Sequence, residues 1–160
     1  MLKRPWNRIN LPVYSISSHD GNGQYNMHII TYASQISMQP KRFICGVFRG
    51  TKTLENITNH PQFVLQLLAS QQYRLTDLLG KKSGNQIDKI ARLEKRKLLS
   101  EWKGYKVLSD SLAVMELKVI SSFDGGDHIG FLCDVVDYKN LNEGEALTLD
   151  ILREHKLIRI

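Results

Sequence analysis

The residue types best suited to chemistry gather in two stretches of the chain. In "SSFDGGDHIGFLCDVVDYK", residues 121–139, Asp127 and His128 stand where a glycine turn enters an apolar strand. A histidine changes charge near neutral pH, and a neighbouring carboxylate can orient its ring. The pair is therefore a candidate for work on a ligand, with a purely structural role at the turn as the alternative.

The second stretch is "TYASQISMQPKRFICGVFRGTKTLEN", residues 31–56. A predicted strand ends at Arg49 and is followed by Gly50, Thr51, Lys52 and Thr53, where a short helix is expected to begin. Backbone N–H groups, hydroxyls and a guanidinium would then meet where the helix dipole is positive, which suits an anion. The alternative is a capped helix with solvated basic residues, and Lys52 is expected to point to solvent.

Other motifs with a known mechanism are missing from the sequence. It contains no Walker loop, HExxH, nucleophile elbow or dinucleotide-binding glycine run. Cys45 and Cys133 lie inside apolar runs, and their spacing indicates no metal site. We expect two buried, reduced thiols, which makes a cytoplasmic protein the default.

Composition indicates one globular domain over residues 1–160, since 42% of the residues are hydrophobic and 24% charged. The 22 Lys and Arg against 16 Asp and Glu give a net charge of +6, which favours an anionic partner without identifying it. No apolar run is long enough to span a bilayer, and no signal peptide is recognised, so we expect no membrane contact.

Hydrophobic periodicity predicts mostly strands, with a few helices outside them. The expected strands are 13–17, 26–34, 42–50, 61–69, 112–123, 128–139 and 152–160, and the expected helices are 51–60, 71–82 and 87–102. The strand at 42–50 is nearly all apolar and is expected to be buried on both faces; the one at 61–69 could also be helical. Because strands follow one another without alternating helices, the order predicts a mainly β, α+β protein with an antiparallel barrel or sheet.

The two stretches, together with a third, resemble the flavin reductase-like family, FMN-binding proteins of the split β-barrel fold with Greek-key strand order. The resemblance runs from Tyr32 through "SMQP" to "FRGTKTLENI", then "LLGKKSGNQIDKIAR" and "GGDHIGFLCDVVDYK", in the family order. The sequence differs at Pro40-Lys41, where Pro-Pro is common, and at Asn26-Met27-His28, where Gly-Met-Thr is usual.

The resemblance implies FMN in a groove outside the barrel, at a homodimer interface. The residues it assigns to the isoalloxazine ring are Thr31, Tyr32, Ala33, Ser34, Gln35, Ser37 and Met38. Those it assigns to the ribityl chain and phosphate are Arg49, Gly50, Thr51, Thr53, Asn56 and Lys89. Ser34 and Ser37 could instead cap a turn, Asn56 could cap its helix, and Lys89 could lie on a solvated helical face.

His128 is expected to lie over the flavin or the nicotinamide, oriented by Asp127. The activity that the resemblance implies is hydride transfer from NADH or NADPH to FMN, with a partner monooxygenase or another electron acceptor downstream. One alternative is a flavoredoxin-like electron-transfer protein that does not oxidise nicotinamide. A basic nucleic-acid-binding barrel is a third reading, but the strand aromatics are not interleaved with basic residues, so no nucleic-acid partner is expected.

Overall fold

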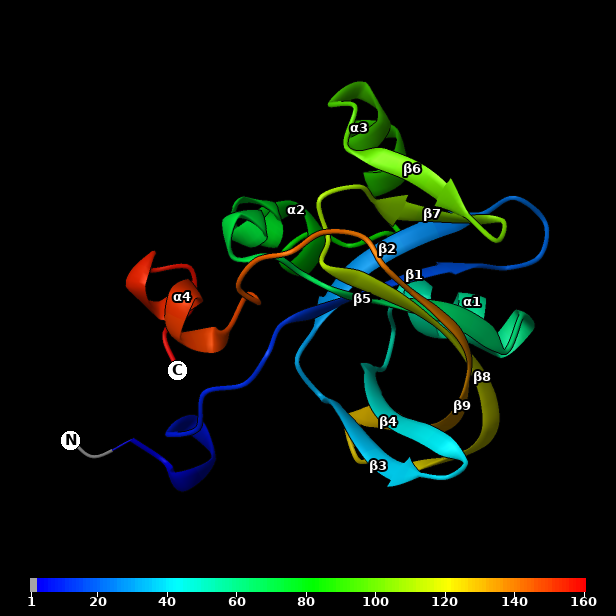
Figure 1. Cartoon of the computed structure of the whole chain (residues 1–160), viewed down its shortest axis with the longest axis horizontal. Coiled ribbons are helices and arrows are strands. Elements are labelled where there is room, and N and C mark those ends of the chain that lie inside the picture. Colours follow the sequence, from blue (N-terminus) through cyan, green and yellow to red (C-terminus); the bar gives the residue numbers. More distant parts are fainter. Residues whose placement is uncertain (1–2) are drawn as a thin grey trace.

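A computed structural model describes residues 3–160 of the chain and contains one large antiparallel sheet (Figure 1). The strands are β1 (Tyr14–His19), β2 (Tyr25–Ile30), β3 (Ala33–Met38), β4 (Lys41–Phe48), β5 (Gln62–Leu67), β6 (Leu99–Trp102), β7 (Tyr105–Leu108), β8 (Ala113–Asp124) and β9 (His128–Asn140). The helices are α1 (Lys52–Asn59), α2 (Thr76–Gly80), α3 (Lys89–Lys95) and α4 (Leu149–Glu154), with short 3-10 turns at η1 (Pro5–Asn7) and η2 (Ser70–Leu75).

The large sheet has the strand order β2-β1-β5-β8-β9-β4-β3, and β6 and β7 form a separate hairpin. The sheet wraps around its own core, because Ile30 from one end of that order and Phe43 from near the other join one buried cluster. The chain passes from β2 to β3 through Thr31 and Tyr32, and the Gly46 N–H on β4 donates to the Tyr32 carbonyl at 2.7 Å. The predicted mainly β, antiparallel barrel with peripheral helices is confirmed.

Local chemistry explains the two connections nearest the site. In the turn between β1 and β2, the Asp20 carboxylate accepts the N–H groups of Asn22 and Gln24. The sequence allows either Thr51 or Thr53 as the cap of α1, and the structure shows Thr51, whose hydroxyl accepts the Leu54 N–H at 3.2 Å. The cap places α1 directly after β4, so Arg49 and Gly50 form the corner between them.

Apolar side chains form two main cores, one inside the barrel and one beneath the helices. The barrel core includes Ile16, Phe63 and Leu117, all fully buried. The second core joins Met27 of β2 to Leu79 of α2 and Leu93 of α3. The second core therefore holds α2 and α3 against β2, which brings the loop between them close to the start of α1, where Gly84 lies beside Lys52.

The predicted helix over 87–102 is wrong in its second half. Helix α3 ends at Lys95, Lys97 takes a left-handed φ of 58°, and the chain turns into β6, which pairs with the unpredicted strand β7. The sequence alternates ambiguously here, and pairing with β7 outweighs the helical tendency of a basic segment. The strand predicted at 152–160 is also wrong, because α4 occupies 149–154.

Two further predictions about strands need correction. The expected strand at 26–34 is divided into β2 and β3, so Ser34, Gln35 and Ser37 belong to a separate strand and do not end the one before it. Strand β4 is not buried on both faces: Phe43, Cys45 and Val47 are buried, while the alternate residues Ile44 and Gly46 face a cavity. The strand at 61–69 is confirmed as β5, not a helix.

No helix within residues 3–160 is long and apolar enough to cross a membrane. Cys45 and Cys133 are both buried and unpaired, as predicted. Burial raises the pKa of each thiol above its ordinary range, so neither thiol is activated.

Candidate functional site

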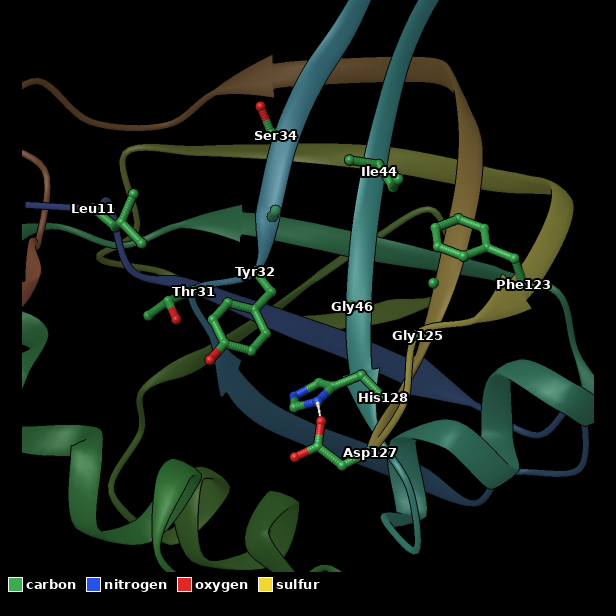
Figure 2. Close-up of a pocket in the computed structure, with 12 residues that line it drawn as sticks. Leu11, Thr31, Tyr32, Ser34, Ile44, Gly46, Phe123, Gly125, Asp127 and His128 are labelled. Atoms are coloured by element: carbon green, nitrogen blue, oxygen red, sulfur yellow. Dashed lines mark hydrogen bonds and ion pairs between the residues drawn. The ribbon is translucent and has the colours of Figure 1, made fainter. Parts of the chain in front are cut away.

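A cavity of about 450 Å³ lies beside the predicted site, between the start of β3 and the β8–β9 turn (Figure 2). Thr31, Tyr32, Ala33 and Ser34 line one side. The other side carries Phe123, Gly125, Asp127, His128 and Gly130, with Ile44 and Gly46 from β4 between the two. We call this the ring cavity.

Two glycines on neighbouring strands form part of the floor of the ring cavity. Gly46 and Gly130 are direct partners in the β4–β9 pairing, and both line the cavity. A Cβ atom on Gly130 would lie 2.1 Å from the Phe123 ring, and one on Gly46 would lie 3.2 Å from Cβ of Tyr32. The missing side chains therefore let the Phe123 ring pack directly on Gly130 and let Tyr32 lie close to Gly46. Aromatic side chains thus line the cavity, which suits a planar ligand.

His128 and Asp127 stand at the rim of the ring cavity. Asp127 Oδ1 lies 2.6 Å from Nδ1 of His128, and Figure 2 shows the imidazole between this carboxylate and the Tyr32 ring. The His128 ring centre is 4.9 Å from that of Tyr32 and 5.2 Å from that of Phe48. With Nδ1 held by the carboxylate, Nε2 is the ring nitrogen left for a ligand.

A second cavity of about 280 Å³ lies at the start of α1 and is strongly cationic. Its basic lining residues are Arg49, Lys52, Lys81, Lys82 and Lys89, beside the hydroxyls of Thr51, Thr53 and Ser83. We call this the cationic cavity. A third cavity of about 350 Å³ shares Tyr32 and His128 with the ring cavity, and His28 and Thr51 with the cationic one. The three thus form one continuous groove.

Arg49 is held by two hydrogen bonds, although its side chain is 47% exposed. Its Nε donates to the Gly126 carbonyl at 2.7 Å and its Nη2 to Asp124 Oδ1 at 2.8 Å. The Gly126 N–H and the Arg49 guanidinium together hold the pKa of the Asp124 carboxyl below its usual range. Arg49 therefore ties the end of β4 to the β8–β9 turn and links the two ends of the groove.

Lys89 is buried, which the sequence left open. Its side chain is only 3% exposed, and Nζ donates to the Leu79 carbonyl at 3.3 Å. Burial lowers the pKa of Lys89 to about 8. A buried ammonium is stabilised when an anion enters beside it.

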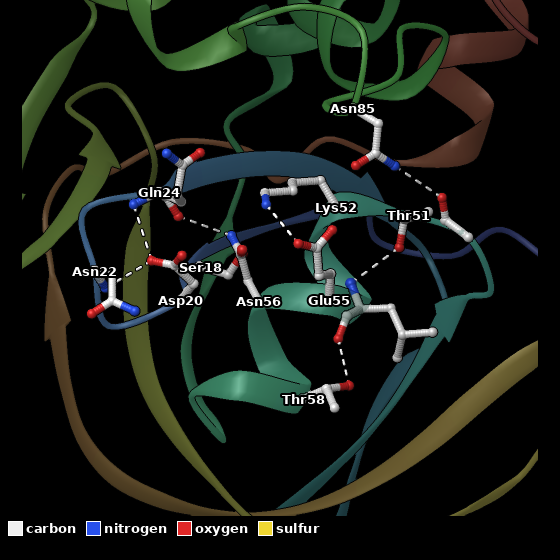
Figure 3. A network of polar contacts seen from close by, with 12 residues as sticks. Ser18, Asp20, Asn22, Gln24, Thr51, Lys52, Glu55, Asn56, Thr58 and Asn85 are labelled. Carbon is white, nitrogen blue, oxygen red and sulfur yellow. Dashed lines mark hydrogen bonds and ion pairs between the residues drawn. The ribbon is translucent and has the colours of Figure 1, made fainter.

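The start of α1 is held by a polar network (Figure 3). Asn85 donates to the Gly50 carbonyl, and Lys52 pairs with Glu55 at 3.0 Å. The Lys52 side chain is only 16% exposed and lines the cationic cavity, so the expectation that it points to solvent is wrong. Its stem lies against Gly84, whose added Cβ would come within 3.1 Å of the Lys52 Cβ.

The structure places most, but not all, of the predicted site residues along this groove. Arg49, Gly50, Thr51, Thr53 and Lys89 line the cationic cavity. Gln35, Ser37 and Met38 lie further along β3 and line none of the three cavities. Asn56 is fully buried beneath the β1–β2 turn, where it donates to Ser18 Oγ and the Gln24 carbonyl (Figure 3).

Sequence reasoning missed His28, Phe48 and the glycine pair. His28 could not be assigned to a face of its strand. It lines the cationic cavity and also the third cavity, which we call the middle cavity because it lies between the other two. Gly46 and Gly130 are 84 positions apart in the chain and gain meaning only from the β4–β9 register. No group of three or more metal-ligating side chains occurs in the part of the chain that the structure describes.

Both a family model and a curated relative match most of this chain. Residues 6–154 match the model of the flavin reductase like domain. The high molecular weight rubredoxin of Moorella thermoacetica is 30% identical over 138 residues, which are 85% of this chain and 58% of that protein. The chain thus spans less than two thirds of this curated relative.

Two solved structures illustrate the likeness in fold. The FMN-binding protein from Thermus thermophilus is 18% identical, with a TM-score of 0.75 over 88% of this chain and 76% of its own. The flavin reductase of styrene monooxygenase from Pseudomonas putida is 17% identical, with a TM-score of 0.72 over 88% of this chain and 86% of its own. These similarities confirm the split-barrel fold.

Proposed function

The chain belongs to the flavin reductase-like domain family, and we propose that it binds FMN in the groove and passes hydride to it from NADH or NADPH. The observation that carries this proposal is the pairing of an aromatic-lined cavity with a cationic one along a single groove. FMN has the same two ends, a planar apolar ring and a phosphate. The flavin supplies the two-electron acceptor, and the protein supplies binding and orientation.

The ring cavity would hold the isoalloxazine. Phe123, packed on Gly130, and Tyr32, beside Gly46, would bound it on two sides. The polar edge of the ring needs donors and acceptors, which the backbone at 31–34 and the Ser34 hydroxyl can supply. The Ser34 hydroxyl now donates to the Gln35 carbonyl at 3.1 Å, an exposed bond that a ligand can replace.

The cationic cavity would hold the phosphate. Arg49, whose guanidinium already pairs with Asp124, and the buried Lys89 offer charge-assisted donors. The Thr51 hydroxyl donates to the Phe48 carbonyl at 2.9 Å and caps α1, so it fixes the corner at Gly50. This preorganisation lowers the entropy lost on binding.

His128 would position the nicotinamide at the rim. Hydride transfer needs the two rings stacked in register, and no protein nucleophile is required. Asp127 holds the imidazole through Nδ1, so Nε2 can donate to a carbonyl or pyrophosphate oxygen of the incoming dinucleotide. His128 thereby orients the hydride donor, and Asp127 acts through it.

We propose that the chain works as a homodimer. Ile36 and Met38 on β3 and Val136 and Tyr138 on β9 are large apolar side chains that are at least half exposed. A second copy would bury them, and Gln35 and Ser37 on the same strand would then lie at the interface, near the ring of a bound flavin.

A second candidate function is electron transfer without nicotinamide oxidation. It is favoured by the similarity to a protein named high molecular weight rubredoxin, since a rubredoxin is an electron carrier. The styrene monooxygenase relative instead suggests a monooxygenase partner that accepts reduced flavin. Aerobic consumption of NADH and NADPH with added FMN distinguishes the two functions: a yellow, FMN-loaded protein with no turnover would contradict the reductase and leave the carrier.

Two further predictions stay part of this proposal. Residues 1–160 form one FMN-binding domain, and the family match over residues 6–154 supports it. A cytoplasmic location is consistent with the two buried, unpaired cysteines. Binding of FMN but not of an oligonucleotide would exclude the basic nucleic-acid-binding barrel.

A further inference from the structure

His28 lies on β2 at the junction between the cationic cavity and the middle cavity of the groove. It is partly buried, and its Nδ1 is 2.7 Å from Oγ1 of Thr53. No hydrogen bond from Nε2 to another described residue, 3–160, is present. Nε2 is therefore the ring nitrogen that can meet a ligand.

A chain of hydrogen bonds fixes which ring nitrogen carries the proton. Asn26 Nδ2 donates to Thr53 Oγ1 at 2.9 Å, so that oxygen already accepts one bond. Thr53 is fully buried, and its hydroxyl hydrogen needs an acceptor. His28 Nδ1 is the acceptor within reach, so Nδ1 carries no proton and neutral His28 carries its proton on Nε2.

The surroundings keep His28 neutral. Burial, with the nearby charges of Lys89 on α3 and His128 on β9, lowers the pKa of His28 to about 3. The other charged groups lining the cationic cavity that His28 shares are Arg49, Lys52, Lys81 and Lys82, all cations. A sixth positive charge among them would cost free energy, whereas a neutral N–H adds a donor without repulsion.

We propose that His28 is a phosphate ligand that acts as a neutral Nε2–H donor, and that Asn26 and Thr53 position it. The inference deepens the proposed function, because it rests on FMN being the ligand and assigns one more contact to its phosphate. It also sets specificity: a fixed neutral donor favours a phosphate oxygen at the junction over a cationic ligand group.

The first test compares FMN with riboflavin, which lacks the phosphate, in fluorescence titrations of His28→Leu and His28→Gln. Glutamine can place an amide N–H near the position of Nε2 and is the matched control. We expect His28→Leu to weaken FMN binding by roughly 10- to 100-fold and riboflavin binding by less than about twofold, and His28→Gln to restore most of the FMN affinity. Equal losses for both flavins, or none, would overturn the phosphate contact.

The second test asks whether His28 stays neutral. Calorimetry of FMN binding at pH 6 in two buffers of different ionisation enthalpy measures proton uptake. We expect wild type and His28→Gln to take up the same number of protons, because His28 binds without titrating. Uptake that is larger in wild type and lost in His28→Gln would show a protonated His28 and overturn the assignment.

The third test addresses Thr53. Nitrogen-15 NMR of the His28 ring should show the proton on Nε2 in wild type and in Thr53→Ser, which keeps the hydroxyl, and a mixture of tautomers in Thr53→Val. A proton on Nδ1 in wild type contradicts the positioning chain. If wild type binds neither flavin, the proposed function fails; if FMN binds and these variants change nothing, only the role of His28 fails.

Discussion

Replacing Lys89 with methionine separates the stability of the fold from the affinity of the site. Lys89 is 3% exposed, and burial lowers its pKa from the ordinary 10.5 to about 8. That difference means the buried ammonium costs about 3 kcal/mol of folding free energy at neutral pH. Methionine has similar length and no charge, so it removes this cost. The hydrogen bond to the Leu79 carbonyl is lost as well, which lowers the stability of the variant by about 1 kcal/mol.

We therefore expect Lys89→Met, without ligand, to be more stable than wild type by about 2 kcal/mol at pH 7. The folded pKa lies below the unfolded one, so the cost is fully present below pH 8. The cost disappears as pH rises through about 8 to 10.5, because the Lys89 side chain of wild type is then neutral in the folded and unfolded states, and its burial no longer desolvates a charge. Urea denaturation at pH 7 and pH 10 measures both stabilities, and the advantage should shrink at the higher pH.

The same variant should bind FMN about 10- to 100-fold more weakly, since a charge-assisted bond to phosphate is lost. Lys95→Met is the matched control, because Lys95 is an exposed lysine on the same helix, outside the groove. It should change neither stability nor affinity by much. If Lys89→Met is less stable than wild type at pH 7, or binds FMN equally well, the reasoning about a buried cation held ready for an anion is refuted.

Three further changes test other parts of the groove. His128→Ala should reduce NAD(P)H turnover about 10- to 100-fold with little loss of stability, measured by steady-state kinetics and thermal unfolding; lost stability with normal turnover would make the residue structural. Gly84→Ala should force the loop between α2 and α3 outward, because the new Cβ would lie 2.2 Å from Asn26 Oδ1. The variant should bind FMN several-fold more weakly and riboflavin as tightly as wild type. Unchanged FMN binding would show that this loop does not shape the phosphate end of the groove. Met38→Asp places a charge on a side chain that is 82% exposed on β3, so it should shift the protein from dimer to monomer in sedimentation without unfolding it; a wild-type monomer would contradict the proposed interface.

The parts of the fold set by local chemistry were predictable from the sequence. Thr51 as a helix cap and the turn at Asp20 depend on side chains that bond to neighbouring backbone groups. Strands β8 and β9 alternate clearly enough for a strand to be expected. The two clusters of candidate residues were found for the same reason, since Arg49 follows the end of a recognisable strand and His128 stands at the start of another.

The rest depended on contacts between distant segments. Lys89 lies between Asp88 and Ile90 in a segment that carries many basic residues, and only the packing of α3 on β2 buries it. The Gly46–Gly130 floor exists only because of the β4–β9 register. The sequence pattern of residues 96–102 predicted a helix. The segment forms β6 instead because it pairs with β7, a strand that was not predicted. Asn56 shows the opposite case. It is a plausible ligand residue in the sequence, but in the structure its amide donates to Ser18 and Gln24 around the β1–β2 turn.

Titration of the ligand-free protein with FMN, and in parallel with riboflavin, tests the central claim most directly. The claim is that a planar ring lies in the ring cavity, between Tyr32 and Phe123, while a phosphate lies among Arg49, Thr51 and Lys89. We predict a saturable change in flavin absorbance and fluorescence with both compounds, and at least about tenfold tighter binding of FMN, as a charge-assisted phosphate contact supplies. Absence of any flavin binding, or equal affinity for the two, would contradict the account.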